Sequence, residues 1–491
     1  MSEPTECESE SHEPVRNVVL VVLDTARATS VSERTMPTLT ALAAEGTTFE
    51  RAYSSAPWTL PSHASLFTGT RTSEHGAHGG HTYLSGEFRT VAEAFSDAGY
   101  ETVGVSNNTW ITEEFGFDRG FDQLRRGWQY LQSETDMGTV VRAEHLGWKL
   151  ESMRERLFEG NPLVNAANVL YSEVIRPQGD DGADRATTWA TEWLEDREDD
   201  RPFFLFCNYL EPHVEYDPPE EHARRFLPEG TYEEATAIRQ DPRAYDCEAY
   251  DLTEREFDLL RGLYRAELAY VDDQLGRLRD ALEASGQWEK TLLVVCGDHG
   301  ENVGDHGFFG HQYNLYDSLL HVPLVCHGGP FSDDSRTDLV QLLDVPTSLL
   351  EAAGIEDDAF DEQGQGRSLL AGASEPREAV LAEYVSPQPE IERLEDRFGD
   401  LPERVYGFDR GLRAIRTHEY KYVTGDGFER LHDVRTDPLE GTDLSAERPE
   451  VAEELRERLE HRLDGLEAGA SDGSVEMRES TKDRLADLGY L

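Results

Sequence analysis

The sequence has few basic residues for its length. Its 491 residues include 46 lysines and arginines against 99 aspartates and glutamates, which gives a formal net charge of −53 at pH 7. The acidic excess is spread along the whole chain, and this indicates a solvated acidic surface that stays soluble at very high salt. We therefore expect a cytoplasmic protein of a halophilic archaeon. We expect no nucleic-acid partner, because binding a phosphate backbone needs basic patches.

Cysteines and long apolar runs are also scarce. None of the five cysteines forms a CxxC pair, which is typical of a reducing compartment; they are Cys7, Cys207, Cys247, Cys296 and Cys326. No run approaches the roughly 20 apolar residues that a membrane-spanning helix needs. The N-terminus lacks the pattern of a signal peptide. We expect no membrane partner.

Apolar runs alternate with helical patterns through much of the chain. Residues 17–23 form a continuous apolar run, as in a parallel strand buried on both faces. The further expected strands are 101–105, 203–208, 291–296 and 321–326, and the expected helices include 36–45, 90–98, 252–284 and 345–353. This alternation predicts an α/β fold with a doubly wound, mostly parallel sheet and helices on both faces.

Changes in composition suggest three parts. Residues 1–16 form an acidic tail that we expect to be disordered. Residues 17–385 form the main domain, interrupted by a mostly helical insertion at about 123–200 and a surface loop at 216–250. Residues 386–491 form a smaller C-terminal α+β subdomain with an antiparallel sheet and a terminal helix.

Four residues with ligand or nucleophile chemistry stand at element ends. Asp24 follows the first strand, and Asp298 and His299 follow a later one, where ligands of parallel sheets gather. Thr59 begins a segment that reads as a helix start, and helix starts suit a phosphate or sulfate group. If these segments meet, they offer oxygen and nitrogen ligands to a divalent cation beside a hydroxyl nucleophile.

Ordered motifs along most of the chain resemble the sulfatases, within the alkaline phosphatase superfamily. The motifs are residues 17–24, 36–46, 58–69, 211–216, 270–276, 297–310, 315–324, 413–421, 431–434 and 437–440. The resemblance implies an alkaline-phosphatase-like fold. It also implies a hydrolase acting on ester bonds of small-molecule or glycan sulfates or phosphates.

The chain departs from the sulfatase pattern at four places. Thr59 stands where sulfatases have a cysteine or serine that matures to formylglycine, and threonine cannot undergo that conversion. Threonine is the nucleophile in related phosphodiesterases and phosphotransferases, so phosphoester chemistry is a rival. His63 replaces the signature arginine, and Thr25 replaces a second aspartate. The expected lysine is missing, and either His311 or Gln312 falls in its place.

The resemblance implies one divalent cation, with Asp24, Asp298, His299 and Thr59 as its ligands. A second metal is not expected, because no histidine between Thr59 and Asp298 has an aspartate four residues before it. Calcium is the habitual sulfatase metal. The nitrogen ligand leaves manganese and zinc as alternatives.

The resemblance also implies roles for other histidines. The resemblance makes Thr59, His213 and His311 the catalytic residues, with an imidazole protonating the leaving group. It places His63, His213 and His311 at the substrate. His306 has no firm role. A metal cluster of His75, His78 and His81 is less expected than a glycine-rich surface loop.

Three functions stay open at this point. The first is hydrolysis of a sulfate or phosphate monoester or diester through Thr59. The second is a phospho- or sulfo-group transferase or mutase of the same superfamily. The third is a non-catalytic protein that binds anionic glycans. The sequence names neither the ester nor the oligomeric state.

Overall fold

The computed structural model describes most of the chain. The described residues are 14–129, 131–133, 161–170, 179–372, 375–463 and 477–487. The predicted acidic tail lies outside them except for residues 14–16, and so does much of the predicted insertion at 123–200. Within the described residues, no helix combines the length and apolarity that a membrane crossing requires.

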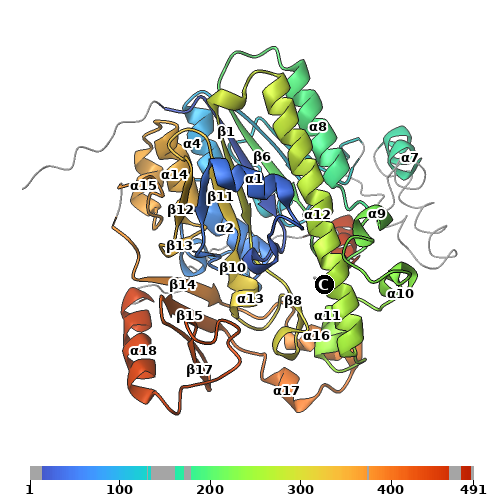
Figure 1. Cartoon of the computed structure of the whole chain (residues 1–491), viewed down its shortest axis with the longest axis vertical. Helices are drawn as coiled ribbons and strands as arrows, with labels where there is room; N and C mark the ends of the chain where they lie inside the picture. The colour runs from blue at the N-terminus through green and yellow to red at the C-terminus, as the bar shows by residue number, and fades with distance from the viewer. Residues whose placement is uncertain are drawn as a thin grey trace, which may run out of the picture.

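The centre of the molecule is an eight-stranded sheet with the order β12-β2-β11-β7-β1-β6-β4-β5 (Figure 1). Its strands are β1 (Asn17–Leu23), β2 (Thr47–Phe49), β4 (Glu101–Ser106), β5 (Gln123–Arg126), β6 (Phe203–Tyr209), β7 (Thr291–Gly297), β11 (Leu324–His327) and β12 (Asp334–Arg336). The five strands from β5 to β7 are parallel, and β11 is antiparallel to β7. The predicted α/β class with a mostly parallel sheet is confirmed.

Helices cover both faces of this sheet. Val19 and Val21 of β1 pack toward α1 (Pro37–Glu45), α8 (Ala183–Asp196) and α12 (Glu254–Ala284). Val18 and Leu20 belong to the core on the opposite face, with α2 (Thr59–Thr68), α4 (Val91–Asp97) and α14 (Asp344–Ala352). Figure 1 shows α8 and α12 side by side, away from α4 and α14. Burial on both faces explains the continuous apolar run of β1.

A second sheet lies in the C-terminal part, in the orange and red region of Figure 1. It is an antiparallel sheet of β14 (Ala379–Tyr384), β15 (Leu412–Thr417), β16 (Tyr420–Gly425) and β17 (Phe428–Asp433). Leu455 and Leu459 of α18 (Pro449–Leu463) pack against Ile415 and Tyr422 of this sheet. Its first strand lies just before the boundary predicted at 385.

Three segments differ from the sequence predictions. Residues 123–126, placed in the helical insertion, form the edge strand β5. The predicted loop at 216–250 contains three short helices: α9 (Glu220–Ala223), α10 (Tyr232–Thr236) and α11 (Pro242–Asp246). The single strand predicted at 321–326 is split at Pro323, which has no N–H for a ladder hydrogen bond. Its first part, β10 (His321–Val322), pairs instead with β3 (Ala52–Tyr53).

The remaining helices and strands are short. They are α3 (Thr72–His75), α7 (Pro162–Leu170), α13 (Asp317–Leu320), α15 (Asp358–Gln363), α16 (Ile391–Phe398), α17 (Glu403–Tyr406), α19 (Glu479–Asp487), β8 (Asn302–Val303), β9 (Phe309–Gly310) and β13 (Val340–Gln341).

Candidate active site

The register of the central sheet brings two carboxylates together. Asp24 directly follows β1 and Asp298 directly follows β7. These strands are parallel neighbours, and Leu23 stands opposite Gly297 at their carboxyl ends. The next residue on each strand is therefore one of the two aspartates, so the strand pairing itself places the carboxyl groups at one edge of the sheet.

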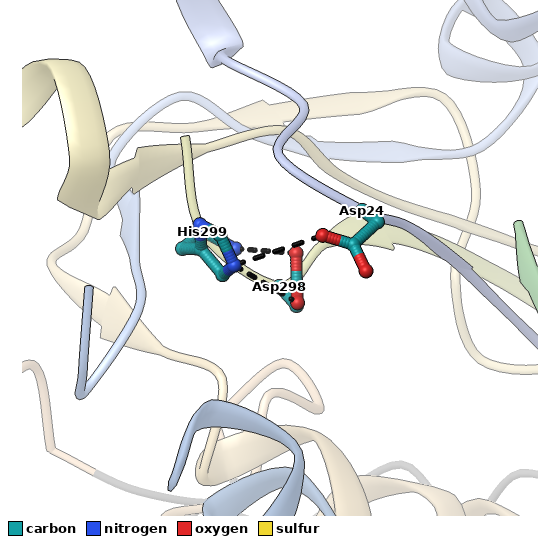
Figure 2. Close-up of side chains that lie close together, drawn as sticks. All are labelled: Asp24, Asp298 and His299. Carbon is teal, nitrogen blue, oxygen red and sulfur yellow. Dashed lines mark hydrogen bonds and ion pairs between the residues drawn. The ribbon is translucent and has the colours of Figure 1, made fainter. Parts of the chain in front are cut away.

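Asp24, Asp298 and His299 form a buried cluster at this edge. His299 Nε2 lies 3.7 Å from Asp24 Oδ1 and 3.4 Å from Asp298 Oδ2. The three candidate ligand atoms all lie within 4.8 Å of one another, and all three side chains are buried. Figure 2 shows them pointing toward a common centre.

The atoms facing this centre suit a cation. His299 Nδ1 donates to the carbonyl oxygen of Gly300 at 2.9 Å, which leaves the lone pair of Nε2 facing the two carboxylates. Asp24 Oδ1 and Asp298 Oδ2 are buried and have no hydrogen-bond partner among the described residues. Three lone-pair-bearing atoms that face one another match the oxygen and nitrogen ligand set of a divalent cation.

Burial and mutual repulsion disfavour charge on these groups when no cation is bound. Burial and the neighbouring Asp298 charge raise the pKa of Asp24 well above its usual value. Burial raises the pKa of Asp298 to about 6 and lowers the pKa of His299 to about 3. A nearby cation favours the ionised carboxylates and so acts against the first two shifts.

Thr59 is the first residue of α2 and its hydroxyl reaches the cluster. Thr59 Oγ1 lies 3.3 Å from His299 Nε2. Ser62 Oγ donates to the carbonyl oxygen of Asp298 at 2.7 Å, which ties the first turn of α2 to the end of β7. First-turn N–H groups have no partner within a helix, so the N-terminus of α2 favours a negative group next to Thr59.

Two asparagines at strand ends also belong to the site, although the sequence analysis did not find them. Asn108 lies just beyond β4, and its Nδ2 donates to Asp24 Oδ2 and, at 3.4 Å, to Thr59 Oγ1. Asn108 Oδ1 accepts from the N–H of Trp110 at 2.9 Å, which fixes the orientation of the amide. Asn208 lies near the end of β6. Like Asp24, both asparagines lie near the carboxyl ends of parallel strands, where ligands gather.

His63 supports the cluster from inside the protein. Its Nδ1 donates to the carbonyl oxygen of Thr59 at 3.0 Å and lies 3.4 Å from Asp298 Oδ2. Its Nε2 is 3.5 Å from the side-chain amide of Asn208. Both ring nitrogens of His63 face protein atoms, which suits a role in positioning Thr59 and Asp298; the substrate contact expected for His63 stays a prediction.

His213 and His311 continue from the cluster as a row of imidazoles. The His311 ring centre is 4.7 Å from that of His299 and 5.2 Å from that of His213. His311 Nδ1 bonds Glu301 Oε1 at 2.9 Å, and His213 Nδ1 bonds the carbonyl oxygen of Val214. Burial lowers the pKa of both His213 and His311 to about 3, and it raises the pKa of Glu301 to about 7. Glu301 lies within the motif at 297–310, but no role was predicted for it from the sequence.

The four other histidines considered in the sequence analysis lie outside the row. His75 is buried rather than on a surface loop; its Nδ1 accepts from the N–H of Ala77 at 3.1 Å. His78 and His81 form a short β-bridge. His306 stacks on Tyr316 with a centroid distance of 3.6 Å. Among the described residues, only Asp24, Asp298 and His299 form a cluster of metal-ligand type.

Comparison with known proteins identifies the family of the chain. Residues 16–355 match the family model described as Sulfatase, so the chain belongs to the sulfatase family of ester hydrolases. An arylsulfatase of Clostridium perfringens is 25% identical over 485 residues, which cover 93% of this chain and 96% of that protein.

Solved structures share the fold. A phosphonate monoester hydrolase of Agrobacterium radiobacter superposes with a TM-score of 0.66 at 22% identity and covers 91% of this chain and 95% of its own. A 2-O GAG sulfatase gives a TM-score of 0.66 at 20% identity and covers 96% of each chain. The predicted alkaline-phosphatase-like fold is therefore confirmed.

Proposed function

We propose that this protein hydrolyses a sulfate or phosphate ester through the hydroxyl of Thr59, with one divalent cation bound by Asp24, Asp298, His299 and Thr59. The observation that carries the proposal is the placement of Thr59 Oγ1, 3.3 Å from His299 Nε2. The hydroxyl stands between the N-terminus of α2 and the buried pair of carboxylates. Membership of the sulfatase family supports ester hydrolysis as the reaction class.

The site meets the needs of an in-line displacement. Thr59 Oγ attacks sulfur or phosphorus, the bond to the leaving oxygen breaks, and water then cleaves the ester formed on Thr59. A divalent cation held by the cluster would neutralise the two aspartates and lower the pKa of the Thr59 hydroxyl. The N-terminus of α2 and the Asn108 amide would hold the equatorial oxygens of the transferred group. Calcium is the proposed cation, with manganese and zinc as alternatives.

We infer that His311 and His213 protonate the leaving oxygen. The His311 ring lies 4.7 Å from that of His299, which contacts Thr59, and the His213 ring lies 5.2 Å from that of His311. Burial lowers the pKa of both imidazoles to about 3; the hydrogen bond from His311 Nδ1 to Glu301 acts against this shift, as would the anionic group of a bound substrate. His63 holds Thr59 and Asp298 in place and has no part in the proton transfer.

A panel of esters tests this proposal. The panel is aryl sulfate, aryl phosphate, phosphonate monoester and phosphodiester, each in molar KCl with calcium, manganese or zinc. We expect release of sulfate or phosphate by the wild type and loss of turnover in Thr59→Ala, with Thr59→Ser as the matched control that keeps a hydroxyl. An undiminished rate in Thr59→Ala would overturn the proposal. An esterified glycerol or sugar acceptor in place of the free anion would indicate a transferase.

A further inference from the structure

A cavity separates the segment 308–316 from the C-terminal sheet. Its volume is about 110 Å³, and aromatic rings form its walls. Tyr313 stacks on Phe408 with ring centres 4.9 Å apart and planes inclined by 10°, and Phe308 lies 5.6 Å from Phe408. Phe428 contributes from β17. A dry apolar cavity of about 150 Å³ can hold benzene, so this one is in the size range of a single ring.

The charge around this cavity has the opposite sign to the charge of the protein. Arg404, Arg410, Arg430 and His432 line it, and no aspartate or glutamate is among the described lining residues. This concentration of arginine is unexpected in a chain with 99 acidic and 46 basic residues. Arg404 pairs with Glu248 at 2.6 Å, and Arg430 lies 3.5 Å from Asp443.

Arg410 differs from the other two arginines in its partners. Its guanidinium donates to the carbonyl oxygens of Gly407 and, at 3.3 Å, Asp426. It lies 5.0 Å from the centre of the Phe428 ring, with Arg430 at 4.8 Å from the same ring. Within the described part of the chain Arg410 has no carboxylate partner. Its positive charge is therefore available to an anionic group that enters the cavity.

The cavity begins close to the row of imidazoles. Tyr313 follows His311 by two residues, and two residues of extended chain span at most about 7 Å. Tyr313 has a φ of 64°, a strained left-handed conformation for an aromatic residue, and its ring closes one wall. His311 in turn lies beside His299. Two residues of chain thus join the cavity wall to the row of imidazoles.

We propose that this cavity receives the leaving group of the substrate, and that this group is a ring carrying a second negative charge, bound through Arg410. The inference rests on the proposed function, because it assigns the substrate class of the same reaction. The aromatic walls would contact the ring faces, and the guanidinium would pair with a carboxylate or a second sulfate. Aromatic acids and uronic-acid sugars share this chemistry.

Matched esters test the proposal. One pair is 4-carboxyphenyl sulfate and 4-carbamoylphenyl sulfate, or the corresponding phosphates if the protein cleaves phosphate esters. The two members of the pair differ in charge and little in shape. A second pair, a uronic-acid ester and its amide, separates the sugar source from the aromatic one. We expect the wild type to prefer the charged member of at least one pair by about tenfold in kcat/KM, the effect of one charge-assisted hydrogen bond.

Arg410→Met should abolish this preference, chiefly through KM, whereas Arg413→Met should keep it. Arg413 is the matched control because it lies three residues further along the chain, in β15, half-exposed and outside the cavity lining. The inference would be overturned if the wild type showed no preference, or if Arg410→Met retained the preference. Thr59-dependent turnover in the same experiment would still uphold the proposed function. Absence of Thr59-dependent turnover would overturn the proposed function itself. Calorimetric titration with 4-hydroxybenzoate then tests the cavity directly: equal binding by wild type and Arg410→Met would overturn an arginine-dependent site.

Discussion

Asn108 offers a sharp test of the active-site geometry, because removal of its amide changes the surroundings of Thr59 without removing the nucleophile or a cluster carboxylate. Asn108 Nδ2 donates to a carboxylate oxygen of Asp24 and lies 3.4 Å from Thr59 Oγ1. A hydrogen bond to a charged group contributes about 1.5–3 kcal/mol, which corresponds to about 10–100-fold in rate. We therefore expect Asn108→Ala to lower kcat/KM by about 10–100-fold on the best ester of the panel.

The neighbouring Asn107 supplies the matched control. It is equally buried, but its side chain packs against Gly127 and Gly182. Steady-state kinetics of Asn107→Ala and Asn108→Ala, with thermal unfolding of both, separates a loss of function from a loss of packing. Asn108→Asp should fail to restore the rate, because its carboxylate cannot donate to Asp24. A rate for Asn108→Ala within twofold of the wild type, or an equal loss in Asn107→Ala, would refute the assignment.

Two further predictions concern stability. Chelation of divalent cations should destabilise the protein at pH 7.5 and have little effect at pH 5. In the cation-free protein the pKa of Asp298 is raised to about 6. The contribution of this carboxyl group to stability is therefore fully present below its ordinary pKa of 3.8 and is lost as the pH rises through about 6. Thermal unfolding with chelator or calcium measures this, and an equal effect at both pH values would contradict it. Lys421→Met should lower the free energy of unfolding by about 3–5 kcal/mol, since Asp317 and Glu440, bonded at 2.8 and 2.7 Å, would lose their buried lysine. A loss below about 1 kcal/mol in chemical denaturation would show that this ion pair does not stabilise the fold.

The central sheet could be predicted because its strands carry strong local signals. Burial of β1 on both faces requires the continuous apolar run at 17–23. Asp24 and Asp298 could be placed at the same edge for a related reason, since ligands gather at the carboxyl ends of parallel strands. The split of the strand predicted at 321–326 was missed, although Pro323 was the available signal.

The rest of the site depends on contacts between segments far apart in the sequence. Asn108 acquires a role only because β4 and β6 pack beside β1, an order of strands that local patterns do not determine. His63 faces the cluster because the first turn of α2 is hydrogen-bonded to the backbone of Asp298 through Ser62. Arg410 reaches the same cavity as Tyr313 only through packing of the C-terminal sheet against the segment 308–316.

Catalysis through Thr59 requires a covalent intermediate, so the decisive measurement is to identify the group that Thr59 accepts. Rapid acid quench of the cation-loaded enzyme during turnover of its best ester, followed by peptide mass spectrometry, would detect it. We expect one sulfuryl or phosphoryl group on the peptide that contains Thr59 and none in Thr59→Ala. The same group on a different residue, with turnover by Thr59→Ala at the wild-type rate, would contradict the account.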